Sequence, residues 1–364
     1  MNPKVAARQA RLLQMLENGD EIRIGRERDC PLPLAQLTRL TEDHPDVVKV
    51  YGHGLTAEVF HLKVEGHHWC LKRCRPDSLV ANVDGKTAFL TELERRREIE
   101  SLRELHPTIL SNVVCTSFGS ARAGVLVSPW LRGEPVRRLN ERNLAQMLAV
   151  EAELARWGWF DWDPSPGNLL DDGQQISVFD FGYMWPFDPL HEFNSNGLTD
   201  PAFHVAERLE TRTLSGIWLE EADPLPLFRH WRELCLAWAK GELQYLSREG
   251  ASAPVLARMQ GLVGEWSAAL ASEQALAANW WRDMYRSHRL DIADDLSGKS
   301  CGPVTLRRLD WLEQAVREHF PALADNLGFD EAGLGQAALL QRLGGLREQI
   351  RANLLPTRTS QPAR

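Results

Sequence analysis

The spacing of apolar residues changes along the chain and predicts three kinds of region. Residues 1–20 carry apolar positions at helical spacing among basic side chains, which predicts an amphipathic helix. From Val47 onward the apolar positions mostly alternate. This predicts about five strands up to residue 128, with one helix over 88–105 between them. After Gly133 the helical spacing returns and continues through most of the remaining chain.

Turn-forming residues divide the alternating region into individual strands. The five expected strands are VVKVYGHG, AEVFHLKV, EGHHWCLKRC, VVCTSFGS and AGVLVSPW, and a tight turn at Glu65-Gly66 separates the second from the third. In the later region we expect a helix over 141–157, a short β-hairpin over 168–180 and helical segments from about residue 201. The last residues, PTRTSQPAR, predict a disordered tail.

Composition and charge narrow the class of protein. The chain has 364 residues, 43% of them apolar, which is enough for a sizeable core, and its formal net charge of −8 argues against nucleic-acid binding. No run of 18 apolar residues occurs, and the N-terminal segment has no apolar stretch of signal-peptide length. We therefore expect a cytoplasmic protein without a transmembrane helix. The six cysteines lack the paired spacing of a metal site, so we expect reduced thiols.

The β-rich region and its helix contain residues suited to phosphate binding. GHGLTAEV places Gly52 and Gly54 two apart between strands, where a bare backbone can approach phosphate oxygens; an ordinary hairpin turn is the alternative. Lys72 lies among apolar residues in a later strand, so its ammonium needs an anionic partner unless it faces water at a sheet edge. The helix offers Glu98 as this partner, unless Glu98 lies on a solvated face. The competing partners are Glu92 and Glu94.

Two later segments contain residues suited to catalysis and metal binding. DWDPSPGNLL sets Asp163 and Asn168 five apart around a loop with Pro and Gly, which can hold a carboxylate near a hydroxyl and an amide oxygen near a metal ion. VFDFG ends an apolar strand with Asp180, whose carboxylate suits an oxygen-preferring cation. A polar turn and an ordinary strand-ending Asp are the simpler interpretations. Phe160 and three tryptophans crowd the loop, which is unusual for a solvated turn.

Taken in this order, the five segments resemble the protein-kinase-like superfamily over about residues 48–185. GHGLTAEV resembles the glycine-rich loop G-x-G-x-x-G-x-V, with Ala57 at the third glycine and Val59 at its end. LKR resembles the strand of the phosphate-binding Lys, and REIESLRELHPTIL resembles the helix of the pairing Glu. VLVSPWLRGEP, which contains Ser128 and Trp130, resembles the hinge, DWDPSPGN resembles the catalytic loop, and the DFG triplet is intact.

The resemblance implies an α+β, bilobal fold with a small antiparallel β-rich N-lobe and a larger helical C-lobe that has a helical C-terminal extension. A minimal core of this kind needs fewer than 364 residues, so the surplus lies at both ends. The expected parts are an N-terminal helical extension (1–45), the N-lobe (46–128), the catalytic part of the C-lobe (129–215), the helical extension (216–355) and the tail (356–364).

The resemblance further implies ATP between the lobes and Mg²⁺ beside its phosphates. Lys72, held by Glu98, would neutralise phosphate charge, while Asn168 and Asp180 would hold the metal. Asp163 would orient the acceptor hydroxyl and accept its proton. The implied nucleotide-binding residues are Gly52, Gly54, Ala57, Val59, Lys72, Ser128 and Trp130.

Departures from the family pattern bear on the acceptor. Asp161 stands where the family usually has the His that braces the catalytic loop, and no APE-like motif follows DFG. The PGN loop and the GEP after the hinge look like aminoglycoside-type and lipopolysaccharide-core sugar kinases, which implies a sugar or small-molecule acceptor. A protein Ser/Thr kinase is the alternative. A pseudokinase, acting as a binding module, is the third hypothesis.

Several other residues are suited to contacts with an acceptor or a membrane. A lipopolysaccharide-core acceptor would lie at the inner membrane face, where Lys4, Arg8 and Arg11 of the first helix could meet anionic lipid; a solvated helix is the alternative. His67 and His68 are expected at the surface. Residues 186–215 are expected to contact the acceptor, unless their polar side chains only form surface salt bridges. The residues concerned are Asp188, His191, Glu192, His204, Glu207, Glu210 and Arg212.

The tryptophans suggest how the catalytic loop is held without its usual His. Of 13 tryptophans, only Trp69 precedes the predicted hinge, and three flank Asp163. Large buried rings can wedge a loop while their indole N–H groups find partners, so we expect the three to fix Asp163 in place. They are Trp157, Trp159 and Trp162.

Overall fold

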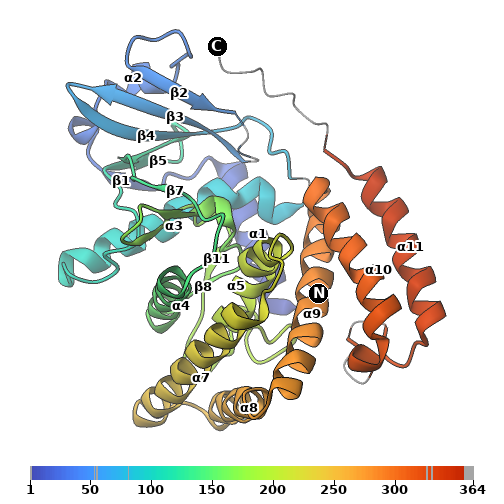
Figure 1. The fold of residues 1–364 in the computed structure, drawn as a ribbon. Coiled ribbons are helices and arrows are strands. Elements are labelled where there is room, and N and C mark those ends of the chain that lie inside the picture. Colours follow the sequence, from blue (N-terminus) through green and yellow to red (C-terminus); the bar gives the residue numbers. More distant parts are fainter. Residues whose placement is uncertain are drawn as a thin grey trace.

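The chain folds into a β-rich N-terminal lobe and a larger helical C-terminal lobe (Figure 1). In the computed structural model, residues 2–52, 54, 56–80, 82–324, 327–328 and 331–355 are described. An antiparallel sheet in the first part and many helices in the second confirm the predicted α+β class. The tail predicted over 356–364 lies outside the described residues.

A six-stranded antiparallel sheet forms the N-lobe, in the order β1-β5-β6-β4-β3-β2. Its strands are β1 (Arg23–Gly25), β2 (Val47–Tyr51), β3 (Ala57–Val64), β4 (His67–Cys74), β5 (Phe118–Ser120) and β6 (Val125–Pro129). The five strands predicted from the alternating pattern are confirmed. β1 lies inside the segment 1–45, which was predicted to be helical, and the short helices η1 (Glu27–Asp29) and α2 (Leu34–Leu37) follow it. A strand of three residues is too short to show an alternating pattern.

Helix α3 (Val83–Leu105) packs against one face of this sheet, where Phe89 and Leu93 share an apolar cluster with Leu126 of β6. It begins five residues before the predicted start, because the Asn82 side chain caps it by accepting a hydrogen bond from a backbone N–H in its first turn at 2.8 Å. The other face of the sheet forms its own apolar cluster with α2 and the residues after it. The sheet is therefore covered on both sides.

The predicted N-terminal helix is α1 (Pro3–Asn18), which packs along α3. Its buried Leu12 joins the apolar cluster between α3 and the sheet. Its first turn reaches the C-lobe, where Nδ2 of Asn2 donates to the carbonyl of Asn196 at 2.8 Å. The helix therefore touches both lobes.

The first part of the C-lobe consists of helix α4 and short antiparallel strands that frame two loops. Its elements are β7 (Glu134–Pro135), α4 (Glu141–Arg156), β8 (Trp159–Asp161), η2 (Pro166–Asn168), β9 (Leu169–Asp171), β10 (Ile176–Val178) and β11 (Met184–Pro186). The predicted helix over 141–157 is confirmed, and β9 and β10 form the predicted hairpin. β8 pairs with β11, which brings the segments before the PGN loop and after DFG side by side.

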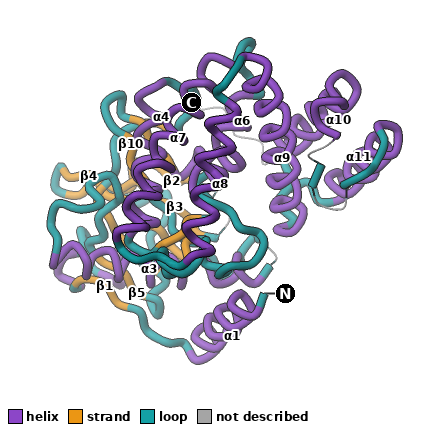
Figure 2. Tube along the Cα trace, turned by 90° about the horizontal axis from the view of Figure 1, so that it is seen from below, coloured by secondary structure: helices purple, strands orange, loops and turns teal. Residues whose placement is uncertain are grey.

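The rest of the C-lobe is helical, as the apolar spacing predicts (Figure 2). One continuous helical stretch consists of α5 (Val205–Leu209), a π-helical turn η3 (Glu210–Leu214) and α6 (Ser215–Trp218). The long helices are α7 (Leu225–Arg248), α8 (Ala253–Ala269), α9 (Glu273–Gly298), α10 (Pro303–Leu323) and α11 (Gln336–Ala352). α7 and α8 share the main apolar core, whereas α10 and α11 form a second core with part of α9.

Candidate active site

Lys72 lies buried at the centre of the candidate site. β4 places it opposite Val59 of β3, on the sheet face that α3 covers. Its Nζ pairs with a carboxylate oxygen of Glu92 and lies 2.8 Å from Oδ1 of Asp180. Burial alone would lower the pKa of this ammonium, but the Asp180 and Glu92 carboxylates raise it above its usual value. Lys72 is therefore a cation held between two acids.

Glu92 is the α3 carboxylate that pairs with Lys72, so the predicted pairing of Lys72 with Glu98 is wrong. Glu92 is 1% exposed, and its second oxygen accepts hydrogen bonds from Nε and Nη2 of Arg96 at 3.0 and 2.8 Å. Glu98 is six residues further on, about 240° around the helix axis, so it points elsewhere. It accepts a hydrogen bond from the Trp159 indole at 2.9 Å.

The DFG triplet packs against α3. Asp180 has a φ of 68°, a left-handed conformation that Asp tolerates better than most residues. Burial opposes ionisation of Asp180, but the neighbouring ammonium and Arg96 hold the pKa of its carboxyl below the usual value. The buried Phe181 ring lies 5.3 Å from the Arg96 guanidinium. A Cβ on Gly182 would come within 3.1 Å of the Ala88 side chain, so glycine allows this close approach.

The turn between β2 and β3 carries the predicted glycines. Arg75 ties them down: its Nη2 donates to the carbonyl of Gly52 at 2.7 Å and its Nε to that of Gly54 at 2.9 Å. A Cβ on Gly54 would lie 2.2 Å from the carbonyl oxygen of Ala57, whereas one on Gly52 would meet nothing within 4 Å. Ala57, at the third glycine position, is buried in β3, so its methyl group fits.

The predicted hinge residues line the sheet face that carries Lys72. Ser128 of β6 lies opposite Cys70 of β4, two residues before Lys72 and thus on the same face. Trp130 follows β6 and stacks on His61, with ring centroids 3.8 Å apart and an interplanar angle of 12°. An aromatic stack beside a buried cation is a suitable wall for a flat heterocycle.

The catalytic-loop residues lie between β8 and β9. Nδ2 of Asn168 donates to the carbonyl of Asp163 at 3.0 Å, which leaves the amide oxygen of Asn168 as an acceptor. Nε of Arg212 donates to Oδ1 of Asp163 at 2.8 Å. Burial raises the pKa of the Asp163 carboxyl, Arg212 offsets part of this rise, and the nearby Asp180 carboxylate adds to it. The fold therefore brings the predicted acids 163 and 180 into one site.

Two arginines four residues apart hold this loop from the α5–η3 stretch. Nε of Arg208 donates to the carbonyl of Trp162 at 3.0 Å, and Arg212 binds Asp163. Thr213 donates its hydroxyl to the carbonyl of Pro164. The carboxylates of α9 that hold the two arginines are Asp291 and Asp294. Sequence reasoning assigned Arg212 to an acceptor and missed Arg208; their spacing on one helix face was the available signal.

Asp161 takes the place of the missing His by fixing the loop backbone. Its Oδ1 accepts a hydrogen bond from the backbone N–H of Asp163 at 2.8 Å. Its Oδ2, and one carboxylate oxygen of Glu151 on α4, are buried without a hydrogen-bond partner among the described residues. Burial raises the pKa of Asp161 to about 8, and burial and the Asp161 carboxylate raise the pKa of Glu151. The protonated form of the Asp161 carboxyl is therefore favoured near neutral pH.

Two of the three flanking tryptophans are anchored as expected. The indole of Trp162 donates to Oγ of Ser195 at 2.8 Å, and the indole of Trp159 binds α3. Trp157 departs from the expectation: it is 39% exposed, with its ring 5.5 Å from that of His106. The loop is therefore flanked by two anchored tryptophan rings and bound by Arg208 and Arg212.

Most of the polar residues predicted to contact an acceptor do not contact Asp163. Of the seven in 186–215, Arg212 is the one for which the described structure gives a contact with Asp163. Asp188 pairs with His191 at the surface at 2.8 Å, and Glu192 pairs with Lys4 of α1. The other three line a cavity among α5, α7, α8 and α9. They are His204, Glu207 and Glu210.

The basic side chains of α1 make contacts within the protein. Arg11 binds both carboxylate oxygens of Glu94 at 2.6 and 2.8 Å, and the Arg8 guanidinium lies 4.3 Å from the Trp185 ring centroid. Contact with a membrane stays a prediction. Over the described ranges, no helix has both the length and the apolar composition for a membrane crossing. His67 and His68 are exposed, as predicted.

The oxygen atoms at the site fit a magnesium ion that shares its coordination with phosphates and water. Mg²⁺ prefers oxygen ligands and commonly uses only one or two protein side chains beside phosphates. The amide oxygen of Asn168 and the carboxylate of Asp180, which is 34% exposed, are such ligands. Within the described part of the chain, no cluster of three or more His, Cys, Asp or Glu residues is placed to hold a metal.

Comparisons with solved structures give partial matches at low sequence identity and low TM-score. No family model and no curated protein matches the chain. Similar solved structures include the BubR1 kinase domain, at 20% identity over 39% of this chain and 47% of that one, with a TM-score of 0.29. An Rv3197–erythromycin complex from Mycobacterium tuberculosis is 17% identical over 43% and 53%, with a TM-score of 0.29. WbdD with the kinase inhibitor LY294002 is 14% identical over 64% and 49%, with a TM-score of 0.28. The chain spans about half the length of these structures.

Proposed function

We propose that the chain is an ATP- and Mg²⁺-dependent phosphotransferase that transfers the γ-phosphate to a hydroxyl group of a sugar or other small molecule. The observation that supports this proposal best is the set of contacts around Lys72. A buried ammonium paired with Glu92 and Asp180, beside a loop that presents Asp163 and Asn168, combines the charges that phosphoryl transfer requires.

Each group has a distinct role in this proposal. Lys72 neutralises phosphate charge, and Glu92 keeps its ammonium in position. Asn168 and Asp180 would hold Mg²⁺, which shields phosphate charge when bound. Asp163 orients the acceptor hydroxyl and accepts its proton. Its raised pKa suits a general base, because such a base works best with a pKa nearer the operating pH.

The segment after DFG supports a small acceptor. Instead of an APE-like motif, residues 186–204 form a turn-rich segment that is tied down internally. Nδ2 of Asn194 donates to the carbonyls of Pro201 and Phe203 at 2.9 and 3.1 Å. Oγ of Ser195 accepts from Trp162 of the catalytic loop. Because this segment lacks the APE-like motif of protein kinases, we favour a sugar acceptor, with a lipopolysaccharide-core sugar as the first to test.

A transfer assay with radiolabelled ATP and Mg²⁺ tests the proposal. Purified protein is incubated in parallel with cell-envelope sugars and with proteins. We expect label on a sugar, and Asp163→Asn should lower turnover by about 10²–10⁴-fold. Asp172→Asn, at an exposed position on the following hairpin, is the matched control and should keep wild-type turnover. Label on protein alone would reject the sugar acceptor, and nucleotide binding without any transfer would indicate a pseudokinase.

A further inference from the structure

The C-lobe contains a cavity of about 310 Å³ that the proposed reaction does not use. It lies among α5, η3, α7, α8 and α9. Arg208 and Arg212 of the α5–η3 stretch contact the catalytic loop, whereas Glu207 and Glu210 line the cavity. The cavity is therefore on the other side of this helix from Asp163. Its volume is at the lower end of the range of small-molecule pockets.

Nearly all charges that line the cavity are paired with one another. Glu207 binds Arg286 at 2.6 Å, and Glu210 binds Arg232 at 2.7 Å. Asp283 accepts from Arg232 and from Arg282, and Glu265 pairs with Arg282. These pairs join three arginines to four carboxylates, so the positive charge of Arg258 brings the formal charge of the lining to zero.

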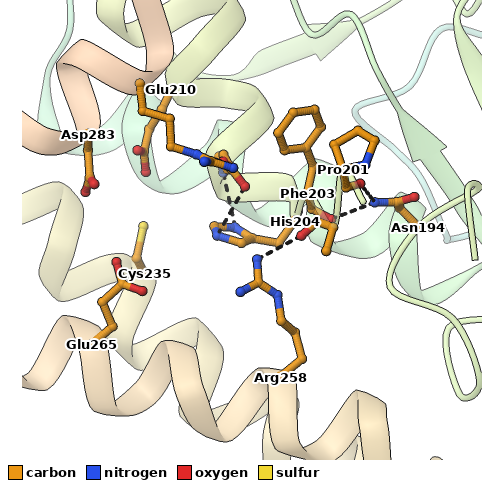
Figure 3. A network of polar contacts seen from close by, with 12 residues as sticks. Asn194, Pro201, Phe203, His204, Glu210, Cys235, Arg258, Glu265 and Asp283 are labelled. Carbon is orange, nitrogen blue, oxygen red and sulfur yellow. Dashed lines mark hydrogen bonds and ion pairs between the residues drawn. The ribbon is translucent and has the colours of Figure 1, made fainter. Parts of the chain in front are cut away.

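Arg258 is the exception among these cations. It extends from α8 toward His204 (Figure 3). Its Nη2 donates to the carbonyl of Ala202 at 2.8 Å, while its Nε is buried and has no partner among the described residues. The described structure gives Arg258 no carboxylate partner. Arg258 is half-buried, and an oxyanion that enters the cavity would give its enclosed Nε an acceptor.

His204 supplies a second donor beside this arginine. Its Nδ1 accepts a hydrogen bond from the backbone N–H of Glu207 at 3.2 Å, so the neutral ring carries its proton on Nε2. Burial, and then three arginine side chains, lower the pKa of His204 well below its usual value, which keeps the ring neutral. Nε2 lies 3.9 Å from the nearest Glu207 oxygen, beyond hydrogen-bond distance. The Trp266 ring, 5.3 Å from the imidazole, adds a flat apolar wall.

We infer that this cavity binds a small molecule with one oxyanion group, a carboxylate or a phosphate, joined to a flat apolar portion. The oxyanion accepts hydrogen bonds from Arg258 and from Nε2 of His204. The apolar portion packs against Trp266 and Leu262. This binding site is separate from the proposed nucleotide site and does not depend on phosphotransferase activity.

Calorimetric titration of the full chain tests the inference. The probes are phenyl phosphate and benzoate, with benzyl alcohol as the uncharged control, each measured with and without a non-hydrolysable ATP analogue and Mg²⁺. We expect one or both anions to bind in either condition and benzyl alcohol to bind much more weakly. The tighter of the two anions identifies the oxyanion.

Variants locate the bound anion. Arg258→Gln keeps the length of the stem but removes the charge, and should weaken binding by about 10-fold or more. Arg248→Gln, at an exposed arginine of α7, should bind as wild type does. Arg258→Lys retains the charge, and its affinity for the anion should lie between those of wild type and Arg258→Gln. It replaces Arg258→Gln in the comparison if that variant unfolds. Equal affinities of wild type and both Arg258 variants, equal binding of benzyl alcohol, or no binding of either anion would overturn the inference.

Discussion

Replacing Glu92 by Gln tests the ion pairs at the centre of the site. The substitution keeps the shape of the side chain and removes one charge from between Lys72 and Arg96, which are 8% and 4% exposed. Removing one partner of a buried ion pair typically costs about 3–5 kcal/mol. Here Lys72 keeps Asp180, and the amide oxygen still accepts from Arg96. We therefore expect a loss of about 2–3 kcal/mol in the free energy of unfolding.

Glu98→Gln is the matched control on the same helix. The Glu98 side chain is 39% exposed, and its buried partner Arg95 keeps Glu94 at 3.6 Å, so we expect Glu98→Gln to cost less than Glu92→Gln. A Gln amide oxygen can still accept the hydrogen bond from Trp159. The two variants therefore change the same functional group at two positions of one helix, and differ in burial.

Urea unfolding of both variants at neutral pH gives the two free energies. Glu92→Gln should be the less stable by at least about 1 kcal/mol. It should also lower kcat/KM for ATP by about 10²-fold, because Lys72 loses its position against the phosphates. Equal destabilisation of the two variants, or a greater loss in Glu98→Gln, would refute the assignment of Glu92 as the partner of Lys72. A clear stability difference with no ATP turnover in wild type would refute only the proposed function.

Two further predictions concern the loops on either side of the site. Gly54→Ala should raise KM for ATP several-fold more than Gly52→Ala, because a Cβ on Gly54 would lie 2.2 Å from the carbonyl oxygen of Ala57; steady-state kinetics that give equal KM values would contradict this. Asp161 has a folded-state pKa of about 8, above its ordinary value of 3.8. Between these two pH values the Asp161 carboxyl is protonated in the folded state and ionised in the unfolded state. The free energy of unfolding therefore falls as the pH rises through this range. Asp161→Asn should therefore show a smaller fall in the urea midpoint between pH 5 and pH 8 than wild type, and an identical fall would count against the raised pKa.

Local patterns along the chain were sufficient for most elements of the fold. The N-lobe strands alternate strongly, and α4 and the β9–β10 hairpin have clear helical spacing and turn signals. The order of the motifs also predicted that Lys72 and Asp180 meet in one site, where the structure places them 2.8 Å apart. β1, with only three residues, offered no such pattern.

The errors in the predicted site arose because the deciding information is not contained in any local sequence pattern. The choice between Glu92 and Glu98 depends on which face of α3 meets the sheet, and tertiary packing sets that face. Arg208 reaches the catalytic loop across 46 residues of sequence and is held by Asp294, which is 86 residues away. Contacts of this range depend on how α5 and α9 pack together. The expectation that buried tryptophans beside Asp163 find partners for their indole N–H groups is confirmed for Trp159 and Trp162, which are close to the loop in sequence.

Helix α1 adds a further connection between the two lobes to the covalent one. The covalent one runs through Trp130; the other is a helix whose one end binds the loop after DFG and whose middle binds α3. Lys72 and Glu98 of the N-lobe also contact Asp180 and Trp159 of the C-lobe, so the contacts of α1 add to these. The N-terminal helix therefore reduces the degrees of freedom with which the lobes can separate. Because Arg11 of α1 binds Glu94 of α3, a movement of α1 would also act on the helix that carries Glu92.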